Sequence, residues 1–329
     1  MKGGRLLAGL WLLVAVLFAA SLLIGPAGLG LMDSLSALLR GEGEAVTLVM
    51  REIRLPRALL GVMVGAALGL SGAAMQGFLR NPLAEPGLIG VSPSAALGAV
   101  IALQTGVAAS FTLALPLAAL AGAGVAVALV LALAGPRGAA LTLILAGIAI
   151  SALAGALMSL VLNLSPNPFA AMEIVFWMMG SLADRSMVHV WLAAPFMAAG
   201  AVILLRLGRA LDALTLGEDA AAALGINLDR LRLGMTFGVA ALVGAATAVA
   251  GAVGFVGLVV PHLLRPLVGA RPSRLLPASA LGGAAVILAA DIATRLIAPD
   301  RDLKLGVLTA LVGAPFFLHL IWRMRKDLA

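Results

Sequence analysis

The sequence predicts an all-α membrane protein with about ten transmembrane helices, and three observations lead to this fold class. Hydrophobic residues occupy 62% of the 329 positions and charged residues only 11%, whereas soluble domains have about 45–50% and about 25%. The apolar residues are spread from residue 6 to residue 322 rather than gathered into one core. The segments between the apolar stretches are short. Residues 1–329 are therefore expected to form a single transmembrane domain.

A spanning helix needs roughly 20 apolar residues, and such stretches recur along the whole chain. The first follows Lys2 and Arg5 and ends near Ala19-Ala20-Ser21, a pattern that also fits a cleaved signal peptide. Its apolar run exceeds the roughly 7–15 residues of a signal peptide, so a retained helix is expected. The eighth is short and holds Pro261 and Pro266, which predicts a half-helix. The expected spans lie near residues 6–24, 57–79, 90–105, 112–134, 139–162, 189–207, 231–252, 255–269, 274–296 and 306–322.

Small residues recur at intervals of four in two of these spans. The second span carries Gly61, Gly65 and Gly69, and the fifth carries Gly147, Ser151, Gly155 and Ser159. Because lipid supplies little hydrophobic drive for helix association, close approach of backbones must supply dispersion contacts instead. Helices that slide against one another and tight packing alone both fit this pattern, and the spacing favours tight packing.

The loop between the second and third spans is polar and patterned. It reads Arg80-Asn81-Pro82-Leu83-Ala84-Glu85-Pro86-Gly87, and Gln76 lies one turn before it. The two prolines and the glycine predict a rigid, non-helical turn. The side chain of Asn81 is expected to satisfy backbone groups that this turn leaves free.

The longest inner loop, about residues 207–230, contains a short helix pattern. Glu218 and Asp219 open it, alanines form its body and Gly225 ends it, as expected for a short capped helix. A short helix joined at both ends to spanning helices suits docking into the groove of a partner protein. The alternative is a helix lying on lipid, which the acidic start makes less favourable beside anionic headgroups.

Arginines gather at the expected outer ends of the second and ninth spans. Arg51, Arg54 and Arg57 lead into the second span, and Arg295 stands one turn after Asp291 in the ninth. Guanidinium groups there can pair with carboxylates of a docking protein or of an anionic substrate. The alternative is that they reach for the membrane interface, with a local Asp291–Arg295 pair.

Lysine and arginine counts predict the orientation of the chain. With the N-terminus inside and ten crossings, fourteen of the 22 lysines and arginines fall on the inner side and eight on the outer side. Both termini are therefore expected in the cytoplasm. This topology explains the net charge of +7 better than nucleic-acid binding does, so no nucleic-acid partner is expected.

The sequence lacks the groups that an enzyme in a membrane would need. No lysine lies in the G-x-x-x-x-G-K-[ST] loop of an ATPase. His189, His262 and His319 show no metal-site spacing and are expected at helix ends or in packing. There is no cysteine. No paired carboxylates at the membrane centre suggest a proton relay, and the inner loops are expected to hold Glu85, Asp212, Glu218, Asp219 and Asp229. We expect neither enzymatic activity nor a metal or cofactor bound by this chain.

Six patterned stretches follow one another between Arg54 and about Leu318. They are Arg54-Leu55-Pro56-Arg57, Ser71-Gly72-Ala73-Ala74-Met75-Gln76, Arg80 to Gly90, Trp177-Met178-Met179-Gly180-Ser181-Leu182, Gly254 to His262, and Thr309 to Phe317. In this order and at this spacing they resemble the FecCD family, the permease subunits of ABC importers for iron-siderophores, haem and vitamin B12. The resemblance covers most of the chain, and six ordered motifs make it specific.

The resemblance implies the type II ABC importer permease fold in a bacterial inner membrane, working as a homodimer with the translocation path at the dimer interface. Two copies of a separate ATPase, which bind ATP and Mg, would dock on the cytoplasmic face, and a periplasmic binding protein would deliver the substrate. Its glutamates would pair with Arg54, Arg57 and Arg295. The segment matching the family's coupling helix, which enters the ATPase, comprises Gly217, Glu218, Asp219, Ala220, Ala221, Leu224 and Gly225.

The resemblance favours haem as substrate because the stretch from Arg80 to Val91 is most similar to the haem permeases. A ferric siderophore and cobalamin remain alternatives, and an ion-gradient-driven secondary transporter is the alternative of a different class. Gln76, Asn81, Met172 and Met178 are expected along the path or its gate. One departure concerns the outer gate, where Asp302-Leu303-Lys304-Leu305-Gly306 stands in place of the usual Glu-Leu-Pro-Val-Gly.

Overall fold

The computed structural model describes residues 2–25, 28–41, 43–135, 140–165, 168–298 and 302–327. Within these ranges every regular element is a helix, which confirms the predicted fold class. The elements are α1 (Lys2–Leu23), α2 (Leu31–Leu39), α3 (Glu44–Leu48), η1 (Val49–Arg54), α4 (Leu55–Phe78), η2 (Pro86–Ile89), α5 (Val91–Gln104), η3 (Val107–Ala109), α6 (Ala114–Ala134), α7 (Ala140–Asn163), α8 (Pro168–Met178), α9 (Met187–Arg206), α10 (Gly208–Leu214), α11 (Glu218–Ala223), α12 (Leu228–Ala250), α13 (Val256–Leu264), η4 (Arg265–Val268), α14 (Pro272–Ile297) and α15 (Leu305–Asp327).

Eight helices in the described ranges are long and apolar enough to cross a membrane. Two shorter apolar helices, Val91–Gln104 and Val256–Val268, stand where the third and eighth spans were expected. The short eighth helix agrees with the predicted half-helix. The second span is longer than expected, because α3, the π-helical η1 and α4 form one continuous helix, Glu44–Phe78. Helix α2, which precedes this helix, was not predicted.

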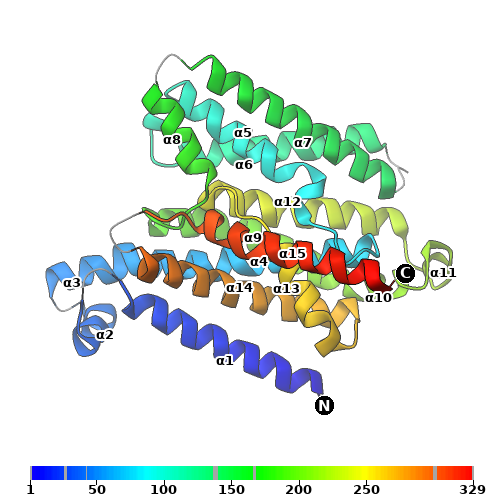
Figure 1. Ribbon diagram of the computed structural model, residues 1–329, viewed down its shortest axis with the longest axis horizontal. Helices are drawn as coiled ribbons and strands as arrows, with labels where there is room; N and C mark the ends of the chain where they lie inside the picture. Colours follow the sequence, from blue (N-terminus) through cyan, green and yellow to red (C-terminus); the bar gives the residue numbers. More distant parts are fainter. Residues whose placement is uncertain are drawn as a thin grey trace.

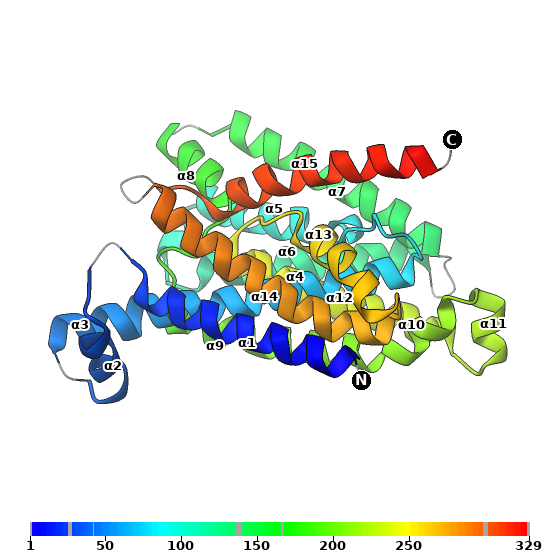
Figure 2. The same ribbon diagram turned by 60° about the horizontal axis from the view of Figure 1, so that its bottom comes forward.

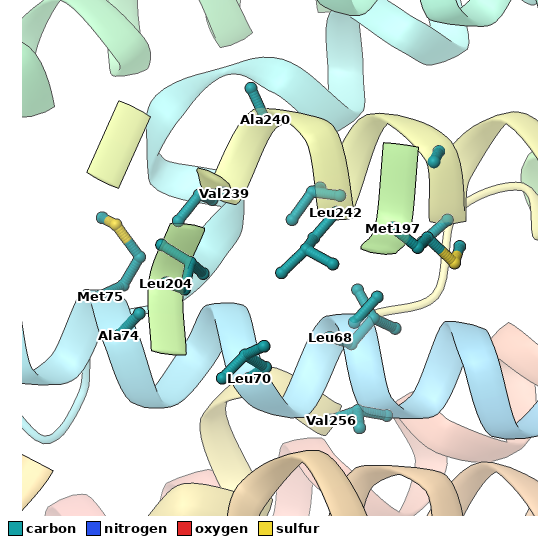
Figure 3. Close-up of a cluster of buried hydrophobic side chains, with 14 of the residues drawn as sticks. Leu68, Leu70, Ala74, Met75, Met197, Leu204, Val239, Ala240, Leu242 and Val256 are labelled. Carbon is teal, nitrogen blue, oxygen red and sulfur yellow. The ribbon is translucent and has the colours of Figure 1, made fainter. Parts of the chain in front are cut away.

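The long helices lie side by side along the bundle (Figures 1 and 2). The central helix α4 packs against α14 on one side and α12 on the other, and α1 covers α14. Helices α5, α6 and α7 form a further layer beyond α12. Leu68 and Leu70 of α4, Leu204 of α9 and Leu242 of α12 meet in the core between these helices (Figure 3).

The two ends of the bundle carry different elements. Helices α2 and α3 lie at one end, here called the α2 end, and α11 lies at the other, the α11 end (Figures 1 and 2). Helix α1 begins and α15 finishes toward the α11 end. The two chain ends therefore lie toward the same end of the bundle, and their placement in the cytoplasm stays a prediction.

Glycines allow the central helices to approach closely. A Cβ atom at Gly65 would overlap the carbonyl oxygen of Gly283 in α14, and one at Gly69 would overlap that of Ser279. In the fifth predicted span, a Cβ atom at Gly147 would overlap the carbonyl oxygen of Leu88 in the same way. A Cβ atom at Gly155 would meet no neighbouring element within 4 Å. The small residues of α4 therefore serve tight packing, and those of α7 do so only at the end that begins the helix.

We expect Gly72→Ala to lower the free energy of unfolding by ~1–3 kcal/mol, because overpacking a close contact forces backbone shifts. The added methyl group would overlap the carbonyl oxygen of Gly257, and backbone atoms cannot move aside as a flexible side chain does. Thermal unfolding of the purified protein in detergent measures the effect. Gly155→Ala is the matched control, with open space around its new methyl group. Equal melting temperatures for the two variants would contradict the close approach of Gly72 to Gly257.

Candidate functional site

The segment at the α11 end forms the predicted short capped helix. Gly217, with φ of +110°, precedes α11, and Glu218 and Asp219 lie in its first turn. Gly225 follows the helix with φ of +84°. Both glycines adopt backbone angles that other residues rarely reach, which explains their places at the two ends. Helix α10 precedes α11 in the same segment and was not predicted.

Polar contacts hold this segment against the bundle. Asp212 of α10 accepts hydrogen bonds from the amide (2.8 Å) and the hydroxyl (2.6 Å) of Ser273, at the start of α14. Arg232 of α12 pairs with Glu218 at 3.1 Å, and Ala221 is fully buried. The segment is therefore fixed to both α12 and α14.

Two large apolar side chains flank α11 and face outward. Leu216 is 69% exposed and Leu224 is 63% exposed. They lie in a segment that protrudes at one end of the bundle (Figure 2), and that also carries the charged Glu218 and Asp219. Binding of this segment to a partner protein stays a prediction.

At the α2 end, two of the three predicted arginines pair with one carboxylate. Asp291 of α14, whose side chain is 2% exposed, pairs with Arg57 of α4 at 2.9 Å and with Arg295 at 2.8 Å. The predicted local pair of Asp291 and Arg295 is confirmed. Arg57, which lies 234 positions before Asp291 in the sequence, adds a second guanidinium group from α4.

Arg54 and Arg295 cap the end of α1. Arg54 donates to the carbonyl oxygens of Leu22 and Leu23, both at 2.9 Å. Arg295 donates to those of Ser21 (2.9 Å) and Ile24 (2.6 Å). The last carbonyls of a helix lack partners within it, so this end of α1 is a natural acceptor. Docking of a binding protein by these arginines stays a prediction, and its glutamates would compete with these internal acceptors.

Gln76 is fully buried in the last turn of α4. Its amide donates to the carbonyl oxygen of Leu258 in α13 at 3.2 Å, and its carbonyl accepts from Arg265 at 2.7 Å. Gln76 thus joins α4 to α13 and η4. Its expected place along a translocation path remains a prediction, and the bonds observed are those of a buried link between helices.

The loop from Arg80 to Gly90 turns back into the bundle. Asn81 accepts a hydrogen bond from the amide of Leu83 at 2.9 Å, which confirms its predicted local role. Pro86 packs against Gly257. A Cβ atom at Gly257 would lie only 3.0 Å from the carbonyl oxygen of Leu68, so Gly257 is also close to α4. Leu68 stands near the middle of α4. The prediction that Glu85 lies in an inner loop was therefore wrong, because the loop carries it to mid-depth.

Four of the motifs from the sequence meet at the break between α12 and α13. Glu85 accepts a hydrogen bond from the amide of Phe255 at 3.3 Å, and Phe255 has a φ of +67° at the start of α13. A Cβ at Gly180 would overlap the oxygen of Ala252, and one at Gly313 would overlap Phe255 itself. This convergence is invisible in the sequence because the motifs are separated by long helices, although the glycines in each motif signal close backbone approach.

Helix α8 presents an apolar face beside the departure from the family pattern. Met172, Phe169 and Phe176 are exposed on it, and Met178 is partly buried. Lys304 pairs with Asp302, and its ammonium lies 5.5 Å from the centre of the Phe176 ring. The lysine that replaces the usual proline is thus held against α8. Whether Met172 and Met178 line a path stays a prediction.

Comparisons with known proteins agree with the motifs. Residues 12–323 match the model of the FecCD transport family. The hemin transport system permease protein HmuU of Yersinia pestis is 36% identical over 98% of this chain and 97% of its own. The cobalamin import system permease protein BtuC of Halobacterium salinarum is 41% identical over 85% and 75% of the two chains.

A solved structure shows the same architecture. A transporter described as being of the metal-chelate ABC type, in an inward-facing conformation, superposes with a TM-score of 0.86. It is 35% identical in sequence, and the match covers 97% of this chain and 99% of the other. The ordered motifs, the helical bundle and these matches together show that the chain belongs to the FecCD transport family and is a multi-pass permease of an ABC importer for substrates of the metal-chelate type.

Proposed function

We propose that this permease works as a homodimer that moves haem across the bacterial inner membrane by alternating access. A separate ATPase powers the transport, and a periplasmic binding protein delivers the haem at the α2 end. Both termini and α11 then lie in the cytoplasm. ATP binding brings the two ATPase subunits together, which moves the two copies of α11 and switches the open side of the path between the permease copies.

The observation that carries this proposal is the exposed pair of leucines beside α11. Leu216 and Leu224 are apolar, exposed and placed at the end that the arginine and lysine counts assign to the cytoplasm. A groove on the ATPase that received α11 would bury both side chains. Because Asp212 and Arg232 tie this segment to α14 and α12, movement of α11 is passed to the spanning helices.

The assignment of haem is supported by the surface of α8. Haem has a flat apolar ring and two carboxylate groups, and α8 exposes Met172, Phe169 and Phe176 next to the cation of Lys304. Soft and aromatic side chains suit the ring, and an ammonium suits a carboxylate. A ferric siderophore and cobalamin are the alternative cargoes of the same machinery.

An ion-gradient-driven secondary transporter is the alternative of a different class. Such transporters bind their coupling ions at interrupted helices near mid-membrane, and α13 does begin at such a break. Membership of an ABC permease family assigns the energy source to an ATPase instead. Whether uptake depends on ATP therefore distinguishes an ABC importer from a secondary transporter.

We expect proteoliposomes that contain the permease, its ATPase and its binding protein to take up haem only when ATP is supplied. Uptake of haem, of a ferric siderophore and of cobalamin is compared at equal concentrations with the matching binding protein. Faster uptake of either other cargo would overturn the haem assignment and leave the ABC mechanism standing. Uptake driven by a sodium or proton gradient without ATP would overturn the mechanism as well.

The same vesicles test docking at the α2 end. Arg57→Glu should weaken the stimulation of ATPase activity by the binding protein, while the basal ATPase rate and the melting temperature show whether the permease itself has changed. Arg40→Glu, an exposed arginine between α2 and α3, is the control outside the cluster. Unchanged stimulation in Arg57→Glu would contradict the docking role.

A further inference from the structure

A cavity of about 190 Å³ lies beside the middle of α4, and three of its lining side chains, Glu85, Ser92 and Thr247, are polar. Val64 and Leu68 of α4 form one wall, and the chain between α12 and α13 forms another. Glu85 is the only charged residue among the fourteen that line it, all of which lie in described ranges. A cavity needs roughly 10–15 Å³ of such volume to hold one water molecule, so this one has room for an ion with part of its hydration shell.

The cavity brings together several kinds of oxygen ligand. One oxygen of the Glu85 carboxylate accepts from the amide of Phe255, and a carboxylate has about four lone-pair sites in all. The hydroxyls of Ser92 and Thr247 lie 3.1 Å apart on the same lining. Residues Gly251–Gly254, which also line the cavity, lie outside any helix. The carbonyl oxygen of Gly254 accepts from the amide of Val256 at 2.9 Å, and the other three carbonyls of this segment are not part of a helical ladder.

The charge of Glu85 has no cationic side chain to balance it within the cavity. No lysine, arginine or histidine is among the lining residues. Arg185 binds the carbonyl oxygen of Val249 in the last turn of α12 at 2.6 Å, and it is not part of the lining. The start of α13 at Phe255 offsets the negative charge only in part. An acidic side chain that faces a cavity inside a membrane protein usually marks a place where an ion or a substrate binds.

We propose that this cavity binds a single alkali cation, Na⁺ or K⁺, between Glu85, Ser92, Thr247 and the backbone of Gly251–Gly254. Hard oxygen ligands suit such ions, and unwound backbone at an interrupted helix is where membrane transporters hold them. One carboxylate balances one positive charge. Ca²⁺ and Mg²⁺ favour sites richer in carboxylates, and the described residues contain no cluster of three histidine, cysteine or acidic side chains.

The bound cation joins two backbone segments that are far apart in the sequence. It links the loop from Arg80 to Gly90 with the break before α13, where Glu85 and Phe255, 170 positions apart, already share a hydrogen bond. The ion stabilises this junction and is not the source of energy for transport. The proposal concerns the permease alone, so it stands or falls independently of the cargo.

The test uses the full-length permease in lipid nanodiscs, without its partners. Binding of ²²Na⁺ and ⁸⁶Rb⁺, the latter as a probe for K⁺, is measured in N-methyl-D-glucamine buffer of fixed ionic strength. We expect saturable binding of one ion per chain, and a melting temperature that rises when Na⁺ or K⁺ replaces the organic cation. Glu85→Gln should weaken binding by about tenfold or more, as expected for loss of a charged ligand.

Two further variants keep the test decisive if Glu85→Gln folds poorly. Glu85→Asp retains the charge and should keep measurable binding, whereas Thr247→Val removes one hydroxyl and should weaken it. Glu173→Gln, an exposed carboxylate on α8, should bind like the wild type. Absence of saturable binding to the wild type, or equal binding by Glu85→Gln and the wild type, would overturn the proposal and show a cavity filled by water alone.

Discussion

Replacing Leu224 with aspartate is expected to weaken binding of the ATPase to the permease by about 30-fold, as for the loss of a central apolar interface residue. Leu224 is 63% exposed, and a groove that received it would have to desolvate the new carboxylate. Haem uptake in the vesicles should fall together with ATPase binding. Because exposed substitutions usually change the free energy of unfolding by less than about 0.5 kcal/mol, the permease alone should melt as before.

The matched control is Leu224→Met, which keeps an apolar side chain of similar volume at the same place. It should bind the ATPase almost as the wild type does. Binding is measured with the two purified subunits in detergent, and melting temperature is measured for each permease variant. Normal ATPase binding by Leu224→Asp would remove α11 from the interface and would undermine the observation on which the proposed function rests.

Asp291→Asn should lower the free energy of unfolding by ~3–5 kcal/mol, the range for breaking a buried ion pair. The carboxylate pairs with Arg57 and Arg295 and is 2% exposed. An amide retains the shape but not the charge, so it leaves two guanidinium groups without a counter-ion. Arg295 also caps the end of α1, and we therefore expect the loss to loosen α1 from α14.

Asp302→Asn provides the comparison for this prediction. Asp302 pairs with Lys304 but its side chain is 63% exposed, and exposed ion pairs contribute only about 0–1 kcal/mol. Thermal unfolding of both variants in the same detergent separates the buried pair from the exposed one. Similar melting temperatures for Asp291→Asn and the wild type would show that the arginine cluster does not stabilise this end of the bundle.

Much of the fold was predictable because spanning helices depend on local composition. Runs of apolar residues predicted α1, α6, α7, α9, α12, α14 and α15 to within a few residues. The two prolines of the eighth span signalled a short helix, and α13 is short. The third span, predicted at residues 90–105, is α5 (Val91–Gln104), which agrees to within one residue at each end.

The candidate sites were predictable to different degrees. Glycines and acidic residues around α11 have a pattern that specifies a short capped helix without help from the rest of the chain. Asp291 and Arg295 lie one helical turn apart, so their pairing also followed from spacing. The attachment of the same cluster to the end of α1 did not, because it depends on how α1 packs against α14.

Glu85 is an example of a residue whose surroundings only the tertiary structure decided. By itself the sequence determined the membrane class, most spans, the turn at Asn81 and the short helix α11, since hydropathy, turn chemistry and capping act over a few neighbouring residues. The tertiary structure decided that Glu85 lies at mid-depth and meets Phe255, 170 positions away. It also brought Arg57 to Asp291 across 234 positions. Such contacts depend on close packing of whole helices, which the order of residues within any one segment does not specify.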